Sequence, residues 1–453
     1  MKKSVQILAA LLVGFSMLLA ACQPAAKPTA VTGTNGEATK PAVANKAPVT
    51  LKFLKINDEL EAKAFTEIVD AWHKVDGGKW AYVNVEYDAK PYAELFPSIE
   101  KAVATGSTVD IVQADGPDVK HFAFNGVLMD LTSKFTADEM KTWDPQSVTE
   151  GSIGSKFYAP PEAESCQLLW YNADMMTAAG IDVSNAAGWI YGDSGTALTN
   201  WKKLSKDANG DGTPEVFGLA NSGPWDYFQR IAPRTNGKPG DATYEGIGAD
   251  GITYTGYFDT PEAITAYKFQ QDMVLKYKVT SAEQTANPML SGLAATQIYQ
   301  DMIMGTQKDQ FASFKMGAIN PPYFQTPMCQ TGSWHYGVTS TTKYPEEALA
   351  FVKYASSDAG AMFIWKYKSQ IPANVNLFNS IADFKDVPAR KMMADFMLQY
   401  GKARIATPSY TEYGALYTEF YKSLVSGEDA TKLAHEYAGL MDQAAKKYAG
   451  WNK

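Results

Sequence analysis

The chain has 453 residues, of which 45% are hydrophobic and 12% aromatic, and its formal net charge at pH 7 is −8. This apolar content suffices for a sizeable core, but the length exceeds that of one compact domain, so we expect two lobes. The negative charge and the lack of a lysine or arginine cluster argue against nucleic acid or an anionic membrane surface as a partner.

The first 22 residues are typical of an export signal. Two lysines follow the initiating methionine, and a nearly unbroken apolar run extends from Ile7 to Ala21. This run is shorter than the roughly 20 residues that a membrane-spanning helix needs. Positions 19–22 read Leu-Ala-Ala-Cys, which resembles the lipobox of bacterial lipoproteins. The resemblance implies cleavage before Cys22 and a diacylglycerol anchor on its thiol; the alternative is a cleaved signal followed by an incidental cysteine.

The segment after the export signal is predicted to be a tether. Residues 23–48 are mainly Pro, Ala, Thr, Lys and Gly, and none is aromatic. Such a composition cannot bury a core and is expected to stay disordered. We therefore assign 1–21 to the signal peptide and 22–49 to the lipidated cysteine and its tether.

Strand and helix patterns alternate once the tether ends. Residues 50–56 predict a strand, an apolar helical stripe covers 65–72, and alternating apolar residues over 83–87 predict a second strand. Pro91 opens another helix, and 109–114 is a short apolar strand. This β-α-β-α-β order predicts a mostly parallel sheet covered by helices.

Polar residues stand where two of these strands end. Asn57 and Asp58 follow the first strand, and Asp115 follows the third. Ligands of parallel α/β sheets bind beyond the carboxyl ends of the strands, so these side chains are candidate ligand contacts. Apolar spacing and helix start signals predict further helices at 173–179, 199–206, 261–277, from 345 onward, and over 411–447 with a break near Gly427.

Two cysteines remain besides Cys22. Cys166 and Cys329 are far apart in the sequence, and an exported location permits them to form a disulfide. They could equally be two buried thiols, since spacing alone does not show whether their Cα atoms approach each other.

Several segments in chain order resemble the extracellular solute-binding lipoproteins of ABC sugar importers, the group that includes maltose-binding protein. The segments are 154–161, 168–172, 206–212, 216–220, 331–338, 345–348 and 406–413. The sequence departs from the family pattern after Gly305, where the usual aromatic residue is missing.

The resemblance implies a two-lobed periplasmic-binding-protein-like fold of type II, with discontinuous α/β lobes that close on a ligand as a hinge. The implied crossovers lie near 163–166, 329–333 and 367–372. The implied lobes are 50–164 plus 332–368, and 165–331 plus 369–453. It also implies a monomer, anchored by lipid in the cell envelope outside the cytoplasm, that delivers a sugar or oligosaccharide to the transmembrane subunits of an ABC importer.

Sugar recognition needs flat aromatic faces together with acids or amides that bind hydroxyl groups. Trp334 is the leading stacking candidate, followed by Trp225 and Tyr413; for each aromatic residue the alternative is a place in the core. The other predicted ligand contacts are acidic and polar residues near these aromatics and at the strand ends. Ser165 stands where relatives often have an acid. The predicted ligand contacts are Asn57, Asp58, Asp115, Glu162, Ser165, Trp225, Asp226, Trp334, Tyr336 and Tyr413.

One loop resembles a calcium-binding loop of the EF-hand type. Its candidate ligands are Asp207, Asn209, Asp211, Thr213 and Glu215, with a glycine at the sixth position. The twelfth position is Gly218, so the bidentate carboxylate is missing. The alternative is a polar turn that links a helix to a strand, and apart from this calcium no cofactor is expected.

No catalytic constellation is visible. The histidines have no zinc-binding spacing, and no G-x-S-x-G motif occurs. A glycoside hydrolase that uses Glu162 and Glu164 as acid and base is the alternative from another functional class, and a surface adhesin is a third. We therefore predict a binding protein that is not an enzyme.

Overall fold

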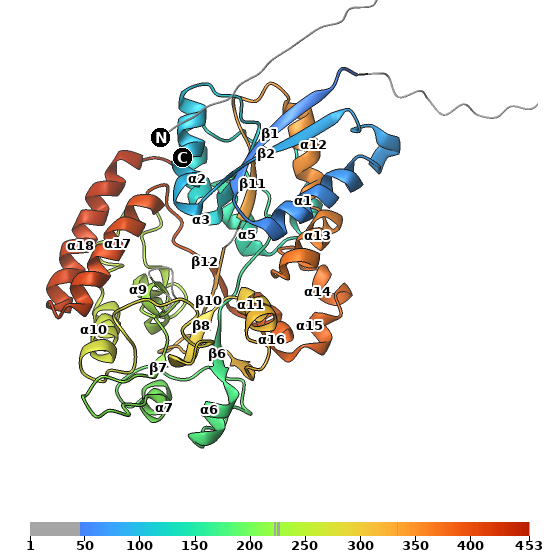
Figure 1. Cartoon of the computed structure of the whole chain (residues 1–453). Coiled ribbons are helices and arrows are strands. Elements are labelled where there is room, and N and C mark those ends of the chain that lie inside the picture. The colour runs from blue at the N-terminus through green and yellow to red at the C-terminus, as the bar shows by residue number, and fades with distance from the viewer. Residues whose placement is uncertain (1–45, 222, 224–226, 333, 453) are drawn as a thin grey trace, which may run out of the picture. The chain divides into compact units, whose positions relative to one another are not determined.

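The first strand of the folded part, which contains the apolar residues of 50–56, belongs to the sheet of the first lobe. The computed structural model describes residues 46–221, 223, 227–332 and 334–452. β1 (Val49–Ile56) runs parallel to both its neighbours, β2 (Val83–Lys90) and β3 (Ile111–Asp115). β11 (Trp334–Val338) runs antiparallel along β3 and completes the order β11-β3-β1-β2 (Figure 1).

Helices cover both faces of this first sheet. They are α1 (Glu59–Trp72), α2 (Tyr92–Ala104), α3 (Gly116–Phe124), α12 (Pro345–Ala355) and α13 (Asp358–Lys368). One core, on the side of α1, α12 and α13, contains Phe53, Phe65 and Phe351. The opposite core, on the side of α2 and α3, contains Leu54 and Phe122. Because neighbouring residues of β1 enter opposite cores, the sheet is buried on both faces, as the predicted β-α-β-α-β order requires.

A second sheet forms the other lobe (Figure 1). β6 (Leu168–Asn172) lies between β8 (Ala294–Tyr299) and β9 (Met316–Ile319) and runs antiparallel to both, and β7 (Phe217–Leu219) runs parallel to β8. The order is β7-β8-β6-β9, so this sheet is mixed. The main helices of this part are α6 (Ala173–Ala178), α7 (Thr196–Leu204), α10 (Pro261–Leu275), α11 (Met302–Gln310), α16 (Pro388–Tyr400), α17 (Tyr410–Val425) and α18 (Ala430–Ala445).

Short elements connect the long ones. The short helices are α4 (Ala137–Met140), α5 (Pro145–Glu150), α8 (Tyr227–Arg230), α9 (Ala242–Glu245), α14 (Leu377–Ser380) and α15 (Asp383–Asp386). The short strands are β4 (Ser152–Ile153), β5 (Lys156–Phe157), β10 (Cys329–Thr331) and β12 (Gly401–Ala403), and 3₁₀ turns occur at Val75–Gly78, Arg234–Asn236 and Lys446–Tyr448.

The predicted helix boundaries agree with the structure where a local signal marks them. The Thr260 side chain accepts a hydrogen bond from the backbone N–H of Ala263, and α10 starts at Pro261 as expected. α17 ends before Gly427, whose φ of +102° favours glycine. α7 starts at Thr196, three residues earlier than predicted. No local signal marks this start, because Gly195 has no side chain that could cap the helix.

Glu164 joins the segments that run between the two sheets. Its carboxylate accepts hydrogen bonds from the Ser147 hydroxyl at 2.6 Å and from the backbone N–H of Gly332 at 2.7 Å. Its backbone N–H donates to the carbonyl of Ile371 at 2.8 Å. The three segments near 164, 332 and 371 therefore lie side by side, where crossovers are predicted; the exact lobe boundaries remain a prediction.

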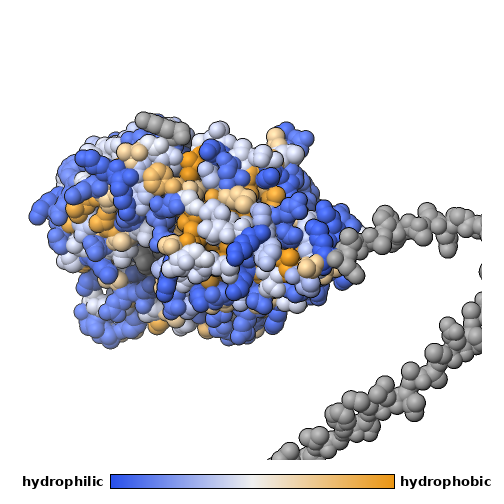
Figure 2. All heavy atoms as spheres, turned by 90° about the horizontal axis from the view of Figure 1, so that it is seen from above, coloured by the Kyte–Doolittle hydropathy of each residue, from blue (hydrophilic) through white to orange (hydrophobic). Residues whose placement is uncertain are grey.

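The surface seen from above is mostly hydrophilic, and its apolar side chains lie in small groups between polar ones (Figure 2). Within the described part of the chain, no helix combines the length and the hydropathy that crossing a bilayer requires. The predicted signal peptide, Cys22 and most of the tether lie outside the described residues.

Cys166 and Cys329 form a disulfide in the structure. Their Cα atoms are 5.6 Å apart, although 163 residues separate them in the sequence. Both side chains are fully buried beside β6 and β10. The disulfide therefore ties the start of the second sheet to the segment that leads back to β11, and it resolves the alternative that the sequence left open.

Replacing both Cys166 and Cys329 by Ala should lower the free energy of unfolding by about 2–5 kcal/mol, because the cross-link restricts a long loop in the unfolded chain. Guanidinium denaturation of the variant and of the oxidised parent protein measures the difference. Equal free energies of unfolding would show that the cross-link does not stabilise the fold.

Candidate ligand-binding site

A cavity of about 360 Å³ lies between the ends of the two sheets. It is lined by Tyr92, Asp115, Tyr299, Gln300, Met302, Gln330, Gly332, Trp334, Gln370 and Arg404. Asp115 is the last residue of β3 and Tyr299 the last of β8. The cavity therefore lies beyond the carboxyl ends of strands from both sheets, and its volume falls within the range of small-molecule sites.

Trp334 forms an aromatic wall of this cavity. Because β11 runs antiparallel to β3, its first residue, Trp334, pairs with the last residue of β3, Asp115. The Trp334 ring is partly exposed and meets the Tyr92 ring edge to face, with 6.1 Å between the ring centres. This register brings the predicted stacking residue and the predicted acid together.

Asp115 is held by an ion pair with Arg404. Both terminal nitrogens of Arg404 donate to the two carboxylate oxygens of Asp115, with 3.0 Å between Nη1 and Oδ2. The Tyr92 hydroxyl also lies 3.4 Å from Oδ2. Arg404 directly follows β12, which pairs with β10, so the ion pair joins the first sheet to a strand pair outside it. A bidentate pair of this kind fixes both side chains in one plane.

Glu150 lies behind this ion pair and is fully buried. Its Oε1 is 4.0 Å from Nε of Arg404. The pKa of Glu150 is raised to about 8, mainly by burial and also by the negative charges of Glu164 and Asp115, whereas the positive charge of Arg404 opposes the shift. A Cβ atom at Gly116 would lie 2.0 Å from one Glu150 oxygen, and a Cβ atom at Gly332 would lie 2.5 Å from the other. A side chain at either position would therefore require Glu150 to move, and the φ of +115° at Gly332 favours glycine in addition.

A family model for bacterial extracellular solute-binding proteins matches residues 57–362, more than half of the chain. The chain belongs to this family. Members of the family are binding proteins and not enzymes, which confirms the prediction that the chain is not catalytic.

Solved structures of other solute-binding proteins share the fold of this family member. An ABC substrate-binding protein of Listeria monocytogenes, in complex with cycloalternan, has a TM-score of 0.73 and 18% identity over 87% of this chain and 98% of its own. The GacH receptor of Streptomyces glaucescens has a TM-score of 0.72 and 18% identity, over 89% of this chain and 100% of its own. The MalE domain of Bdellovibrio bacteriovorus, bound to maltotriose, has a TM-score of 0.70 and 20% identity, over 88% and 100%. These matches confirm the predicted two-lobed α/β periplasmic-binding-protein-like fold.

Two of the predicted contacts are buried in this solute-binding protein. Tyr336 has no exposed surface and packs in the core with Phe53. Glu162 is 1% exposed and accepts a hydrogen bond from Gln113 at 2.8 Å. Burial, and then the nearby Glu61 carboxylate, raise the pKa of Glu162 well above its usual value. The structure therefore contradicts direct ligand contact by Glu162 and Tyr336, because neither side chain offers surface to a ligand.

Two other predicted contacts, Asp58 and Asn57, lie away from the cavity. The Asp58 carboxylate caps α1 through the N–H groups of Leu60 and Glu61 and lies 3.2 Å from the Lys368 ammonium. Burial opposes the change, but the Lys368 charge and these hydrogen bonds lower the pKa of Asp58. Asn57 is exposed beside it, and neither residue lines the cavity. The position of Asp58 at the end of a strand suggested a ligand contact, but its carboxylate caps α1 instead.

The remaining predicted contacts divide into buried residues and residues outside the described part. The Ser165 hydroxyl donates to the carbonyl of Gly332 at 2.8 Å, so it connects two crossover segments. Tyr413 is 4% exposed and stacks on Tyr254 with 5.6 Å between ring centres, which contradicts an open stacking surface. Trp225 and Asp226 lie outside the described residues.

The sequence reasoning missed most of the polar wall of the cavity. Gln300 follows the end of β8, a strand that was not predicted, and Gln330 stands between Thr331 and a disulfide cysteine. Arg404 belongs to no recognisable motif. Had β8 been predicted, its end at Tyr299 would have indicated Gln300, because ligands bind beyond the carboxyl ends of strands.

The predicted calcium loop forms a turn that satisfies its own side chains. The Asp207 carboxylate accepts hydrogen bonds from the N–H groups of Gly210 and Gly212 at 2.7 and 2.8 Å. Glu215 accepts from the N–H of Ala208 at 2.7 Å, and Asp211 accepts from the N–H of Thr213 at 2.8 Å. Over the described ranges, no group of three or more His, Cys, Asp or Glu side chains is arranged to hold a metal ion. This geometry supports the turn, and not the calcium site.

The two glutamates of the hydrolase alternative do not reach the cavity. Glu162 and Glu164 are 1% and 0% exposed, and neither is part of the cavity lining. The two carboxyl groups of a glycoside hydrolase must both reach the bound substrate or its attacking water. The hydrolase alternative is therefore wrong.

Glu150→Gln should flatten the dependence of stability on pH. Because the pKa of Glu150 is raised in the folded state, its contribution to stability is full below the pKa of about 4.3 of an unfolded glutamate and declines as pH rises through about 8. Denaturation between pH 5 and pH 8 should show a smaller fall in the free energy of unfolding for this variant, by on the order of 1 kcal/mol or more. Glu94→Gln, at an exposed glutamate of α2, is the matched control; equal slopes for both variants would contradict the assignment.

Proposed function

We propose that the chain captures a sugar or oligosaccharide in the cavity between its two sheets. The main support for the proposal is that the partly exposed Trp334 ring and the Asp115–Arg404 ion pair line the same cavity. An aromatic face packs against the C–H face of a sugar ring, and a planar charge pair offers both donors and acceptors to hydroxyl groups.

The rest of the lining supports a neutral ligand rich in hydroxyl groups. Gln300, Gln330 and Gln370 add amides, each of which can both donate and accept hydrogen bonds. The one cation of the lining, Arg404, already has its bidentate face occupied by Asp115. A sugar needs paired donors and acceptors and no net charge, and this lining provides that combination.

Structural relatives support the same class of ligand and a role in import. The Listeria and Bdellovibrio proteins are solved with cycloalternan and maltotriose, and the Streptomyces receptor also with acarbose. The first of these is described as an ABC substrate-binding protein. We propose accordingly that this chain closes on its sugar and delivers it to the transmembrane subunits of an ABC importer.

Trp334→Ala should weaken sugar binding while leaving the folded state intact. Thermal-shift screening of a sugar panel identifies the ligand, because a ligand at 100 times its Kd stabilises by about 2.7 kcal/mol. Calorimetry with that sugar should then show a loss of about 1–3 kcal/mol in binding free energy for Trp334→Ala. Trp451→Ala, at a partly exposed tryptophan that does not line the cavity, is the matched control.

Two results would count against this function. A large loss of stability in ligand-free Trp334→Ala with unchanged affinity per folded molecule would make Trp334 a core residue. A panel of mono- and oligosaccharides that produces no stabilisation would exclude a sugar as the ligand.

We also propose that the protein is anchored outside the cytoplasm through lipid on Cys22. The family is extracellular, and the lipobox-like residues 19–22 support the anchor. Cys22→Ala should move the protein from the membrane fraction to the soluble fraction without changing its sugar affinity, because the tether of residues 23–48 separates the anchor from the fold. If the variant stays with the membranes, the lipobox assignment is wrong.

A further inference from the structure

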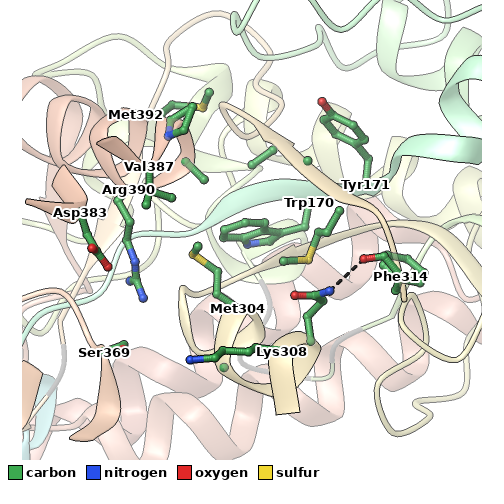
Figure 3. A pocket seen from close by; sticks show the side chains of 17 residues that line it. Trp170, Tyr171, Met304, Lys308, Phe314, Ser369, Asp383, Val387, Arg390 and Met392 are labelled. Atoms are coloured by element: carbon green, nitrogen blue, oxygen red, sulfur yellow. Dashed lines mark hydrogen bonds between the residues drawn. The ribbon is translucent and has the colours of Figure 1, made fainter. Parts of the chain in front are cut away.

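The four arginines of the chain differ in what balances their charge. Arg404 has its carboxylate partner at the proposed sugar cavity, as described above. Arg390 lies at a cavity of about 710 Å³ between the strands β6 and β9 and the helices α11 and α16 (Figure 3). Its Nη1 pairs with the buried Asp301 carboxylate, so this larger cavity has no unbalanced guanidinium. The other two arginines, Arg230 and Arg234, line a different and much smaller cavity.

The cavity beside Arg230 and Arg234 has a volume of about 10 Å³. Arg230 ends α8 and Arg234 begins the 3₁₀ turn that follows, and the two residues are 7% and 5% exposed. Four tyrosines are part of the lining, and its described residues include no aspartate or glutamate. A cavity of this size holds about one water-sized particle.

Arg234 carries a charge that no described carboxylate balances. Its Nε donates to the carbonyl of Tyr244 at 2.9 Å, but its buried Nη1 has no hydrogen-bond partner among the described residues. The charge of Glu245 acts on Arg234, but the Glu245 carboxylate is ion-paired with Lys402 at 2.6 Å. Burial lowers the pKa of Arg234, while the charges of Glu245 and nearby tyrosines oppose this shift. Because buried charges in proteins are normally paired, an anion in this cavity would be stabilised.

Arg230 adds a second guanidinium to the same lining. Its Nη2 donates to the carbonyl of Gly414 at 3.3 Å, and its guanidinium carbon lies 5.1 Å from the centre of the Tyr417 ring and 5.5 Å from that of Tyr413. The pKa of Tyr413 is raised to about 12 and that of Tyr417 well above its ordinary value, in both mainly by burial, so the two phenols are neutral. Neutral rings attract a cation but do not neutralise it.

We propose that this cavity binds one monatomic anion, a halide such as chloride, between Arg234 and Arg230. A halide supplies the negative charge that the described lining lacks and accepts the hydrogen bond that Nη1 of Arg234 can donate. Carboxylates, phosphate and sulfate are polyatomic and exceed the space for one water-sized particle. The bound anion connects α8 and the 3₁₀ turn to α17, the helix of the two tyrosine rings. The site shares no lining residue with the proposed sugar cavity and does not depend on the proposed function.

Thermal unfolding in chloride and in gluconate tests the site, because gluconate is too large for the cavity. Sodium chloride replaces sodium gluconate stepwise at constant ionic strength, so the screening of surface charges stays constant. The Tm of the parent protein should rise with chloride along a saturable single-site curve, because a ligand that binds only the folded state stabilises it.

Two variants assign this response to the cavity. Arg234→Gln should weaken the chloride Kd at least tenfold, because it removes the unbalanced charge. Lys268→Gln, at an exposed lysine of α10, removes one positive charge outside the cavity and should keep the parent response. Crystals of the parent protein grown in sodium bromide should show an anomalous peak between the guanidinium groups of Arg230 and Arg234, a measurement that needs no variant to fold.

Three results would overturn the proposal. The first is an equal Tm in chloride and in gluconate at every step of the replacement. The second is a chloride response that Arg234→Gln retains in full, which would place the anion elsewhere on the protein. The third is a bromide crystal without an anomalous peak in the cavity, which would show that the cavity holds water only.

Discussion

The two lobes depend on one buried carboxylate. Glu164 accepts hydrogen bonds from Ser147 and Gly332, and its backbone N–H reaches Ile371. Each of the three segments between the sheets is therefore connected to the same residue. Burial, and next the negative charge of Asp144, raise the pKa of Glu164 to about 7, whereas its hydrogen-bond donors oppose this shift. A group this strongly enclosed fixes where the chain passes from one sheet to the other, and with it which strand ends face each other.

The cavity follows from that arrangement. β11 enters the first sheet directly after the segment that Glu164 holds, and its antiparallel direction brings Trp334 opposite Asp115. Arg404 reaches Asp115 from the strand pair β10 and β12, which lies next to the disulfide. An aromatic face and a charge pair that come from distant parts of the sequence thus meet because the crossover segments are fixed. The proposed sugar site depends on this connection more than on any one loop.

The sequence predicted the elements better than the contacts. Periodicity and capping residues located β1, α10 and the break before Gly427, because these signals act within a few residues. The roles of acids at strand ends were harder to predict. Asp115 does line the cavity, whereas Asp58 caps a helix and Glu162 faces a buried cluster. The direction of a side chain at a strand end depends on what packs against it, and no local pattern contains that information. Arg404 and the three glutamines of the cavity lining (Gln300, Gln330 and Gln370) were not predicted for the same reason.

Glu150 has a consequence for how related sequences vary. Its two oxygens occupy the space that side chains at positions 116 and 332 would need, and these two glycines lie in different segments, at the start of α3 and between β10 and β11. A relative that replaces Glu150 by a small residue would relieve the main clash at position 116, whereas position 332 would still favour glycine, because its φ is +115° and Arg404 lies 2.8 Å from a Cβ atom there. Positions 116 and 150 should therefore covary across the family, whereas position 332 should remain glycine whichever residue stands at position 150.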